Sequence, residues 1–312
     1  ATGTTLPPPT VGLTPTTITE TMLTGQTADH TITLRNDGDG TLDFVIPQPA
    51  LGEPMAVPQQ PLLLDKDEPD PRSGDPVVTG TGGPDPFGYR WVDSDEPGGP
   101  VFSWTEISGT GTPVAGVTAD DSTSAAIPLT FNFPMYGTFF NSIRVCSNGW
   151  LSFTSSSTAY ANQPLPNAGA PENLVAPFWE DLNPGGATRI YYQTSPTRAI
   201  VEWSGIAPYT GTGTYTFQAI IESSGVITYQ YLSMTGAVNG ATVGIQDSTK
   251  TVGLQTAFNQ AYLHDNLAVR INALPQWLTV SPGSGRIAAG GSVSLNAHID
   301  AAGLEGGTYP GA

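Results

Sequence analysis

The chain has 312 residues, of which 27 are Asp or Glu and 10 are Lys or Arg, giving a formal net charge of −17. A surface this acidic repels phosphate backbones, so we expect no nucleic-acid binding. The 37 glycines and 29 prolines oppose helix interiors, and no long stretch repeats its apolar residues with a helical period. No apolar stretch is long enough to span a membrane. The composition therefore predicts an all-β protein of two domains, suited to the space outside the cell.

The single cysteine, Cys146, excludes an intrachain disulfide. It ends the apolar run Ile143–Cys146, where we expect a small buried side chain rather than a nucleophile. The sequence has no Asn-x-Ser/Thr site, which argues against a eukaryotic glycoprotein, and no signal peptide precedes Ala1. We interpret the chain as a mature or trimmed secreted product.

The N-terminal part predicts an extended arm over residues 1–10 and half of a β-domain over residues 11–47. Residues 31–35 alternate between apolar and polar, residues 36–40 have turn composition, and residues 42–46 resume as a strand. This pattern predicts a β-hairpin.

The composition changes at residues 48–84, where proline recurs, acidic residues cluster and alternation disappears, which predicts a linker or surface loop. From residue 85 to 272, short strand-like runs return between Gly-rich turns, as is typical of an antiparallel, jelly-roll-like β-sandwich. Within residues 215–221 one face carries Tyr215, Phe217, Ala219 and Ile221, and we expect it to be core. Glu202 and Glu222 fall at strand positions expected to face solvent.

The last segment, residues 273–312, alternates cleanly at Val293–Ile299. Together with residues 11–47 it resembles one bacterial immunoglobulin-like module of the Hydin-like or BACON-like kind. The first half carries Leu34–Gly38 and Leu42–Phe44, and the second carries Trp277–Gly285. The resemblance implies a discontinuous immunoglobulin-like sandwich, with the middle of the chain inserted at a loop tip, where insertions are best tolerated.

The middle segment resembles a β-sandwich module of secreted bacterial proteins, often appended to subtilisin-like or other exported proteases, with a distant likeness to nidogen-type domains. The motifs that carry this resemblance are Tyr89–Pro100, Phe133–Gly137, Ser147–Phe153, Ala176–Leu182, Val243–Gln246 and His264–Arg270. The resemblance implies a β-sandwich fold and an extracellular location, and it implies no catalytic role.

Immunoglobulin-like modules of this type continue past a Gly-Thr-Tyr motif into a last strand, whereas this sequence stops at Ala312. An incomplete sandwich exposes a sheet edge, so we expect the arm or a strand of another chain to fill the gap by strand addition. The alternative is a trimmed or disordered tail. The residues expected to take part in assembly are Leu6, Pro7, Pro8, Pro9, Val11, Leu304 and Tyr309.

The sequence contains no pattern typical of an active site. Its three histidines show no metal-ligand spacing, and there is no G-x-S-x-G elbow and no phosphate-binding glycine loop. Glu180 and Asp181 are neighbours that point to opposite faces of a strand, so they could serve one bond only if the strand ended there. We expect no enzyme activity.

Structural calcium is the chemistry that the acidic residues favour. Ca²⁺ prefers carboxylate oxygens, and the turn at residues 93–96 is rich in them. The proposed ligands are Asp93, Asp95, Glu96, Asp120, Asp121 and Asp181.

Three functions remain open at this point. The first is a structural or adhesive surface module that self-associates, as a fibre subunit, or binds neighbouring surface proteins. The second is a carbohydrate-binding module, which would need exposed aromatic platforms among Trp104, Trp179, Trp203 and Tyr209. The third is an accessory C-terminal region of a secreted protease.

Overall fold

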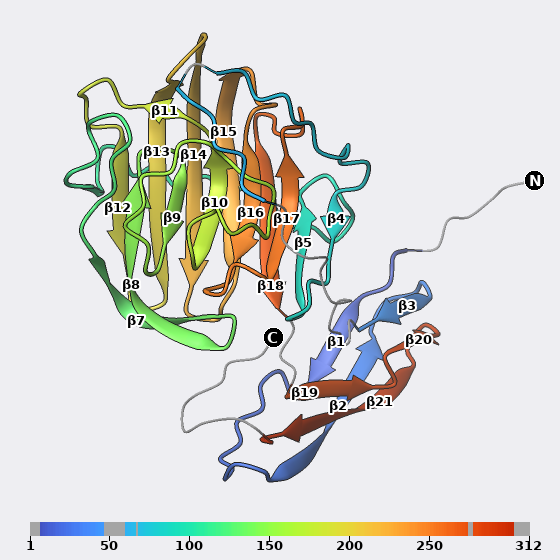
Figure 1. Ribbon diagram of the computed structural model, residues 1–312. Helices are drawn as coiled ribbons and strands as arrows, with labels where there is room; N and C mark the ends of the chain where they lie inside the picture. Colours follow the sequence, from blue (N-terminus) through green and yellow to red (C-terminus); the bar gives the residue numbers. More distant parts are fainter. Residues whose placement is uncertain (1–6, 47–59, 67, 274–276, 303–312) are drawn as a thin grey trace, which may run out of the picture. The chain divides into compact units, whose positions relative to one another are not determined.

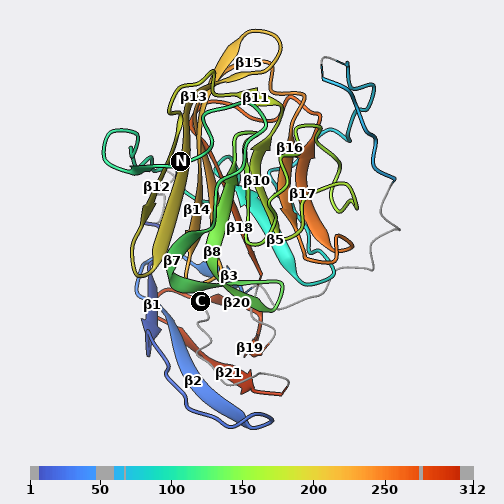
Figure 2. The ribbon, with the colours of Figure 1, turned by 60° about the vertical axis from the view of Figure 1, so that its left-hand side comes forward.

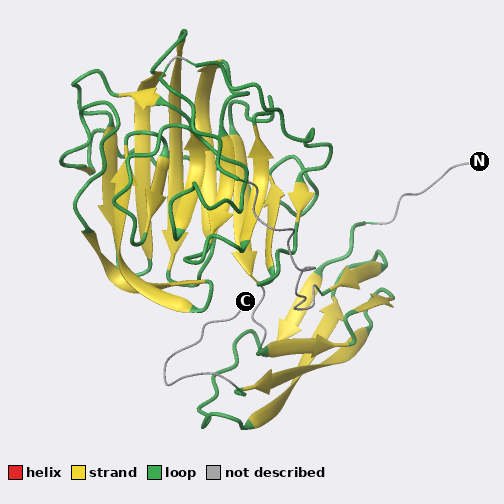
Figure 3. Ribbon diagram, in the orientation of Figure 1, coloured by secondary structure: helices red, strands yellow, loops and turns green. Residues whose placement is uncertain are grey.

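The computed structural model describes residues 7–46, 60–66, 68–273 and 277–302, and within them it contains strands and no helix (Figures 1 and 3). No helix in these ranges could therefore cross a membrane. The predicted all-β class is confirmed. The chain divides into two compact units, which we call the outer unit (residues 1–50 and 274–312) and the inserted unit (residues 51–273).

The outer unit combines strands from both ends of the chain. Its four-stranded sheet has the order β1-β2-β21-β19, and β20 pairs with β3 in a second small sheet. The central pair is antiparallel, with Thr27 opposite Asp300. The strands are β1 (Val11–Thr14), β2 (Thr27–Asn36), β3 (Leu42–Val45), β19 (Leu278–Ser281), β20 (Ser284–Ile287) and β21 (Ser292–Asp300).

The hairpin predicted for residues 31–46 is wrong. β2 pairs with β1 and β21, whereas β3 pairs with β20, so residues 37–41 connect two sheets. Asn36 fixes this connection, because its buried Nδ2 donates to the carbonyl oxygens of Gly40 at 2.6 Å and Ile287 at 3.2 Å. Alternation and turn residues look the same in a hairpin and in a crossover, which is why the sequence pattern was misleading.

The inserted unit consists of two antiparallel sheets. The six-stranded sheet has the order β17-β16-β10-β9-β8-β7, and the larger sheet has the order β4-β5-β18-β15-β14-β13-β12-β6, with β11 also paired to β13. The first sheet contains β7 (Ile127–Met135), β8 (Thr138–Cys146), β9 (Trp150–Ser152), β10 (Leu174–Trp179), β16 (Thr242–Gln246) and β17 (Gly253–Phe258). The second contains β4 (Thr81–Gly82), β5 (Tyr89–Asp93), β6 (Thr112–Pro113), β11 (Leu182–Asn183), β12 (Ile190–Thr194), β13 (Arg198–Pro208), β14 (Gly213–Glu222), β15 (Ile227–Gly236) and β18 (Leu267–Ala273).

The two sheets pack face to face around one apolar core (Figure 2). The face of β14 predicted to be core is buried there, with Trp203 stacked on Phe217 at 5.0 Å between ring centroids. Phe178 of the opposite sheet packs against the same Phe217 at 5.5 Å. Cys146 is fully buried, as expected, and burial raises the pKa of its thiol to about 12. The predicted β-sandwich is confirmed.

The far face of the larger sheet corrects another expectation. Glu202 does not face solvent but is completely buried, because residues 102–107 cross over the sheet at this point. The backbone N–H of Ile107 donates to its carboxyl at 3.1 Å. Strand alternation reports which face a side chain lies on, and it cannot report that a distant segment covers that face.

Candidate functional site

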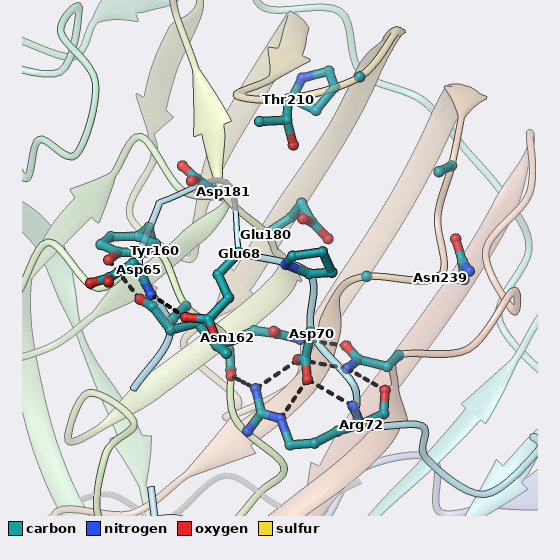
Figure 4. Close-up of a pocket in the computed structure, with 18 of the residues that line it drawn as sticks. Asp65, Glu68, Asp70, Arg72, Tyr160, Asn162, Glu180, Asp181, Thr210 and Asn239 are labelled. Carbon is teal, nitrogen blue, oxygen red and sulfur yellow. Dashed lines mark hydrogen bonds and ion pairs between the residues drawn. The ribbon is translucent and has the colours of Figure 1, made fainter. Parts of the chain in front are cut away.

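A cleft of about 600 Å³ opens at one end of the inserted unit (Figure 4). Three turns line it, namely those that follow β10, β13 and β15, together with residues around Tyr160 and the segment 64–73. The polar side chains around it include Asp65, Glu68, Asp70, Arg72, Asn162, Glu180, Asp181, Thr210, Asn239 and Asn259. The cleft is therefore polar and rich in acidic groups.

Glu180 and Asp181 both line this cleft because β10 ends at Trp179, immediately before them. Strand alternation no longer separates the two side chains. Burial raises the pKa of Glu180 to about 7, and the charge of Asp181 adds to this effect. A hydrogen bond from the backbone N–H of Asp181 acts in the opposite direction and is outweighed. Glu180 can therefore gain or lose a proton near neutral pH.

Lys66 lies at the edge of the cleft and binds three carboxylates. Its Nζ is 2.8 Å from Asp120 Oδ2, 2.9 Å from Asp121 Oδ2 and 2.9 Å from Asp181 Oδ1. Burial alone would lower the pKa of Lys66, but the hydrogen bonds to these carboxylates outweigh burial and raise it. The ammonium group is therefore held in its charged form. The three aspartates form a cation site that a side chain of the same chain fills.

Two aromatic rings complete the surroundings of this ammonium group. Lys66 Nζ lies 3.9 Å from the ring centroid of Tyr209 and 4.7 Å from that of Tyr160, which are cation–π distances. Tyr160 is fixed in place because its OH donates to Leu64 O at 2.8 Å. We call Lys66, the three aspartates and the two tyrosines the ammonium cage.

The Ser147–Phe153 motif contacts the cage through Asn148. Asn148 is fully buried; its Nδ2 donates to Asp121 Oδ1 at 2.9 Å, and its Oδ1 accepts the N–H of Leu182 at 3.0 Å. Gly149 has φ +73°, and a Cβ there would collide with the Phe178 carbonyl oxygen. The Asn-Gly pair therefore allows a tight turn that also positions an aspartate.

The cleft has a second ion pair, between Asp70 and Arg72. Arg72 Nε donates to Asp70 Oδ1 at 2.8 Å, and one of its terminal nitrogens donates to Oδ2 at 2.7 Å. Burial alone would raise the pKa of Asp70, but the hydrogen bonds from Arg72 and Asn259 hold it below the usual value. The described part of the predicted linker thus docks on the sandwich through charged residues.

The structure brings together half of the proposed calcium ligands. One carboxylate oxygen from each of Asp120, Asp121 and Asp181 lies within 4.8 Å of the other two. The turn at residues 93–96 makes other contacts: Asp93 accepts the OH of Tyr262 at 2.7 Å, and Asp95 lies 3.0 Å from His264 Nε2. The Glu96 carboxyl accepts a backbone N–H.

The residues predicted to take part in assembly lie partly outside the described ranges, as Leu6, Leu304 and Tyr309 do. Val11 begins β1 and lies opposite Asn36 of β2. Pro7, Pro8 and Pro9 precede it, and their carbonyls approach the turn glycines of the same unit. The described end of the arm is therefore paired within its own unit.

Sequence reasoning missed the cation at the centre of the site. Lys66 lies next to Asp65 in a segment whose prolines and acidic residues predicted a linker, so its positive charge was not considered. A usable signal existed, because the chain has only two lysines, Lys66 and Lys250. Tyr160, Tyr209 and Asn148 carried no such signal, since only the fold brings them together.

Comparison with known proteins identifies a protein family. A family model described as NIDO related matches residues 101–287, more than half of the chain. No curated protein and no solved structure matches the sequence. The nidogen-type likeness is thus confirmed, whereas bacterial origin and the Hydin-like or BACON-like insertion stay predictions.

Proposed function

Because this chain belongs to the NIDO-related family, we propose that it is a non-catalytic extracellular module with a structural or adhesive role. NIDO-related domains are typically extracellular, and a net charge of −17 suits a soluble surface there. The single observation that carries the proposal is the ammonium cage. In the cage, three carboxylates and two aromatic rings hold Lys66, a cation of the same chain, without covalent chemistry. These groups fix the segment around Lys66 on the sandwich, which supports a structural role over a catalytic one.

A comparison of wild type with the Glu180→Gln variant tests the non-catalytic part of this proposal. Glu180 is the acid of the cleft whose pKa lies near neutrality, so any hydrolysis in the cleft would depend on it. We expect no hydrolysis of glycan or peptide substrates by either protein. Turnover by the wild type that the variant loses would refute the proposal.

Assembly by strand addition is the form of the structural role that we propose. In the described part of the outer unit, β1 and β19 are the edges of the four-stranded sheet. Edge strands present unpaired N–H and C=O groups to another chain. Light scattering and negative-stain microscopy of the purified chain should show concentration-dependent oligomers or filaments. A strict monomer at high concentration would exclude this form of the role.

Calcium binding at Asp120, Asp121 and Asp181 stays a proposal as well. Three carboxylates within 4.8 Å of one another offer the hard oxygen ligands that Ca²⁺ prefers. Since the ammonium group of Lys66 already lies between the three carboxylates, Ca²⁺ would have to displace it. Titration calorimetry of wild type and Lys66→Gln with CaCl₂ should show tighter binding to the variant.

Carbohydrate binding is a second candidate function, supported by one aromatic pair. Phe102 and Trp104 are partly exposed, and their rings lie 6.5 Å apart at an interplanar angle of 20°. Trp104 Nε1 donates to Glu106 at 3.2 Å, so a carboxylate lies beside the rings. In contrast, Trp179 and Trp203 are fully buried. Affinity electrophoresis with polysaccharides would detect binding, and loss of retardation in Trp104→Ala would locate it.

A further inference from the structure

A short segment, residues 102–107, crosses the outer face of the larger sheet, and we call it the strap. Its backbone binds side chains rather than another strand. Ser103 N donates to Gln230 Oε1 at 2.6 Å, and Gln230 Nε2 donates back to Ser103 O at 2.8 Å. Two residues further on, Gln218 Nε2 donates to Thr105 O at 2.6 Å. Ser103 is thus bound by a side chain of β15, and Thr105 is bound by a side chain of β14.

Glu202 provides the third of these attachments. It lies opposite Gln218 on the neighbouring strand, and Gln218 lies opposite Gln230 on the next. Its Oε2 accepts both Ile107 N at 3.1 Å and Gln218 Nε2 at 2.8 Å. The row of three side chains is almost completely buried, with exposures of 0 to 3%.

Two buried oxygens of this row, Glu202 Oε1 and Gln218 Oε1, have no hydrogen-bond partner within the described part of the chain. They belong to side chains that are already hydrogen-bonded to each other. A buried acceptor without a donor is costly, and a buried carboxylate without a cation is more so. A proton on Glu202 Oε1 would remove the charge and create the missing donor.

Glu106 brings a second carboxyl to the same place, from the strap itself. The pKa of Glu202 is raised to about 7, mainly by burial and to a smaller extent by the charge of Glu106 and its contact with the Glu202 carboxyl. The hydrogen bonds from Gln218 and Ile107 act in the opposite direction and are outweighed. The pKa of Glu106 is lowered, first by its hydrogen bond from Ser108. Of the two carboxyls, Glu202 is therefore the one that keeps its proton to higher pH, and Glu106 ionises first.

The other titratable or charged groups at this face do not neutralise Glu202. On its own strand β13, Arg198 donates to Thr105 Oγ1 at 3.0 Å and lies opposite Glu222 of β14. On β12, the residue opposite Glu202 is Tyr191, whose OH donates to a backbone carbonyl. None of them forms an ion pair with Glu202 among the described residues.

We propose that Glu202 is a proton-operated latch: its neutral carboxyl holds the strap on the sheet, and its ionisation beside Glu106 loosens the strap. When both groups are charged, like charges face each other across the contact between strap and sheet. A free carboxyl has a pKa of about 4.5, below that of the closed state, so closure is favoured at acidic pH. This advantage is complete below about pH 4.5 and is lost as pH rises through about 7.

Amide hydrogen exchange followed by NMR tests the latch on the full chain. The amides of Ser103 and Ile107, corrected for the intrinsic pH dependence of exchange, should lose protection by roughly tenfold or more between about pH 5 and about pH 8. The Val201 amide of β13, in the core of the sheet, is the internal reference. Glu202→Gln imitates the neutral acid, and its strap amides should change by less than about twofold over the same range.

Glu106→Gln keeps the latch but removes the neighbouring charge, so its loss of protection should shift to lower pH. This variant changes an exposed side chain, so it keeps the test valid if Glu202→Gln does not fold. The proposal is overturned if wild-type strap protection does not change with pH. It is also overturned if Glu202→Gln follows the wild-type profile, or if Glu106→Gln leaves the profile unmoved.

Discussion

The inserted unit holds its acidic groups in two contrasting ways. In the cleft, Asp120, Asp121 and Asp181 lie around an ammonium group whose side chain is 23% exposed, and Asp70 lies against Arg72. Under the strap, Glu202 is completely buried; its carboxyl accepts N–H groups from Ile107 and Gln218, and no cation of the described ranges pairs with it. A neighbouring cation keeps a carboxylate charged, whereas dry burial beside another carboxyl favours the neutral acid. The carboxylates beside Lys66 and Arg72 thus have a cationic partner, whereas Glu202 under the strap, like Glu180 in the cleft, responds to pH.

The largest effect should come from removing the side chain that supports the cation-paired region. Asn148→Ala would leave the buried N–H of Leu182 without an acceptor and release Asp121 from its hydrogen bond. We expect a loss of about 3 kcal/mol in the free energy of unfolding, measured by urea denaturation. Asn148→Asp keeps the acceptor but adds a fourth negative charge, so it should be destabilised as well. If the alanine variant is as stable as the wild type, Asn148 does not stabilise the cage.

The contrast in pH response should appear in Glu202→Gln. From about pH 5 to about pH 8, the free energy of unfolding of the wild type, measured by urea denaturation, should fall by about 2 kcal/mol more than that of the variant. Only the wild type must give up a proton that its folded state prefers. The comparison uses the difference between the two proteins at each pH, since Glu180 and other acids titrate in both. Parallel stability curves would show that Glu202 is already ionised.

A smaller effect is expected when the cation itself is removed. Lys66→Gln should lower the free energy of unfolding by about 1 kcal/mol. The expected loss is this small because Lys66 is partly exposed and solvent screens its charge. The change should weaken as salt is added, because ion pairs of this kind are screened. Lys250→Gln, which removes the other lysine from a longer ion pair of 3.6 Å, is the matched control. Equal losses in both variants would argue against a special role for the cage.

The smallest effect should come from the aromatic wall of the cage. Tyr209→Leu keeps an apolar side chain but removes the ring that lies 3.9 Å from Lys66 Nζ. We expect a loss of about 0.5 kcal/mol. When Lys66 is already replaced by Gln, Tyr209→Leu should not change the free energy of unfolding. A double-mutant cycle measures the coupling between Tyr209 and Lys66. Additive losses would assign Tyr209 to packing alone.

Much of the fold followed from local pattern. Alternation identified the core face of β14, and the apolar run before Cys146 predicted its burial. The same reasoning failed for β2 and β3, because strand patterns do not specify partners. It failed again at Glu202, where a segment about a hundred residues earlier in the sequence covers the strand.

The site was predictable only in part, for a related reason. Three of the proposed calcium ligands lie together in the cage, and carboxylates are recognisable as cation ligands wherever they lie. Calcium binding by these aspartates stays a prediction. The cation they meet, Lys66, comes from a segment without periodicity, so nothing local indicated where it docks. The structure of the cleft depends on contacts between distant segments, which a single sequence does not reveal.

The pairing of β2 with β21 has a consequence for biosynthesis. A ribosome must translate everything between Asn36 and Ser292 before these strands can meet, which takes on the order of ten seconds or more at about 5–20 residues per second. All-β domains fold in about milliseconds to seconds. The inserted unit therefore has time to fold while the chain is still growing, and the outer unit closes last. Until then β2 lacks its partner β21 and β3 lacks its partner β20, so the nascent chain is most prone to aggregation at its N-terminal end.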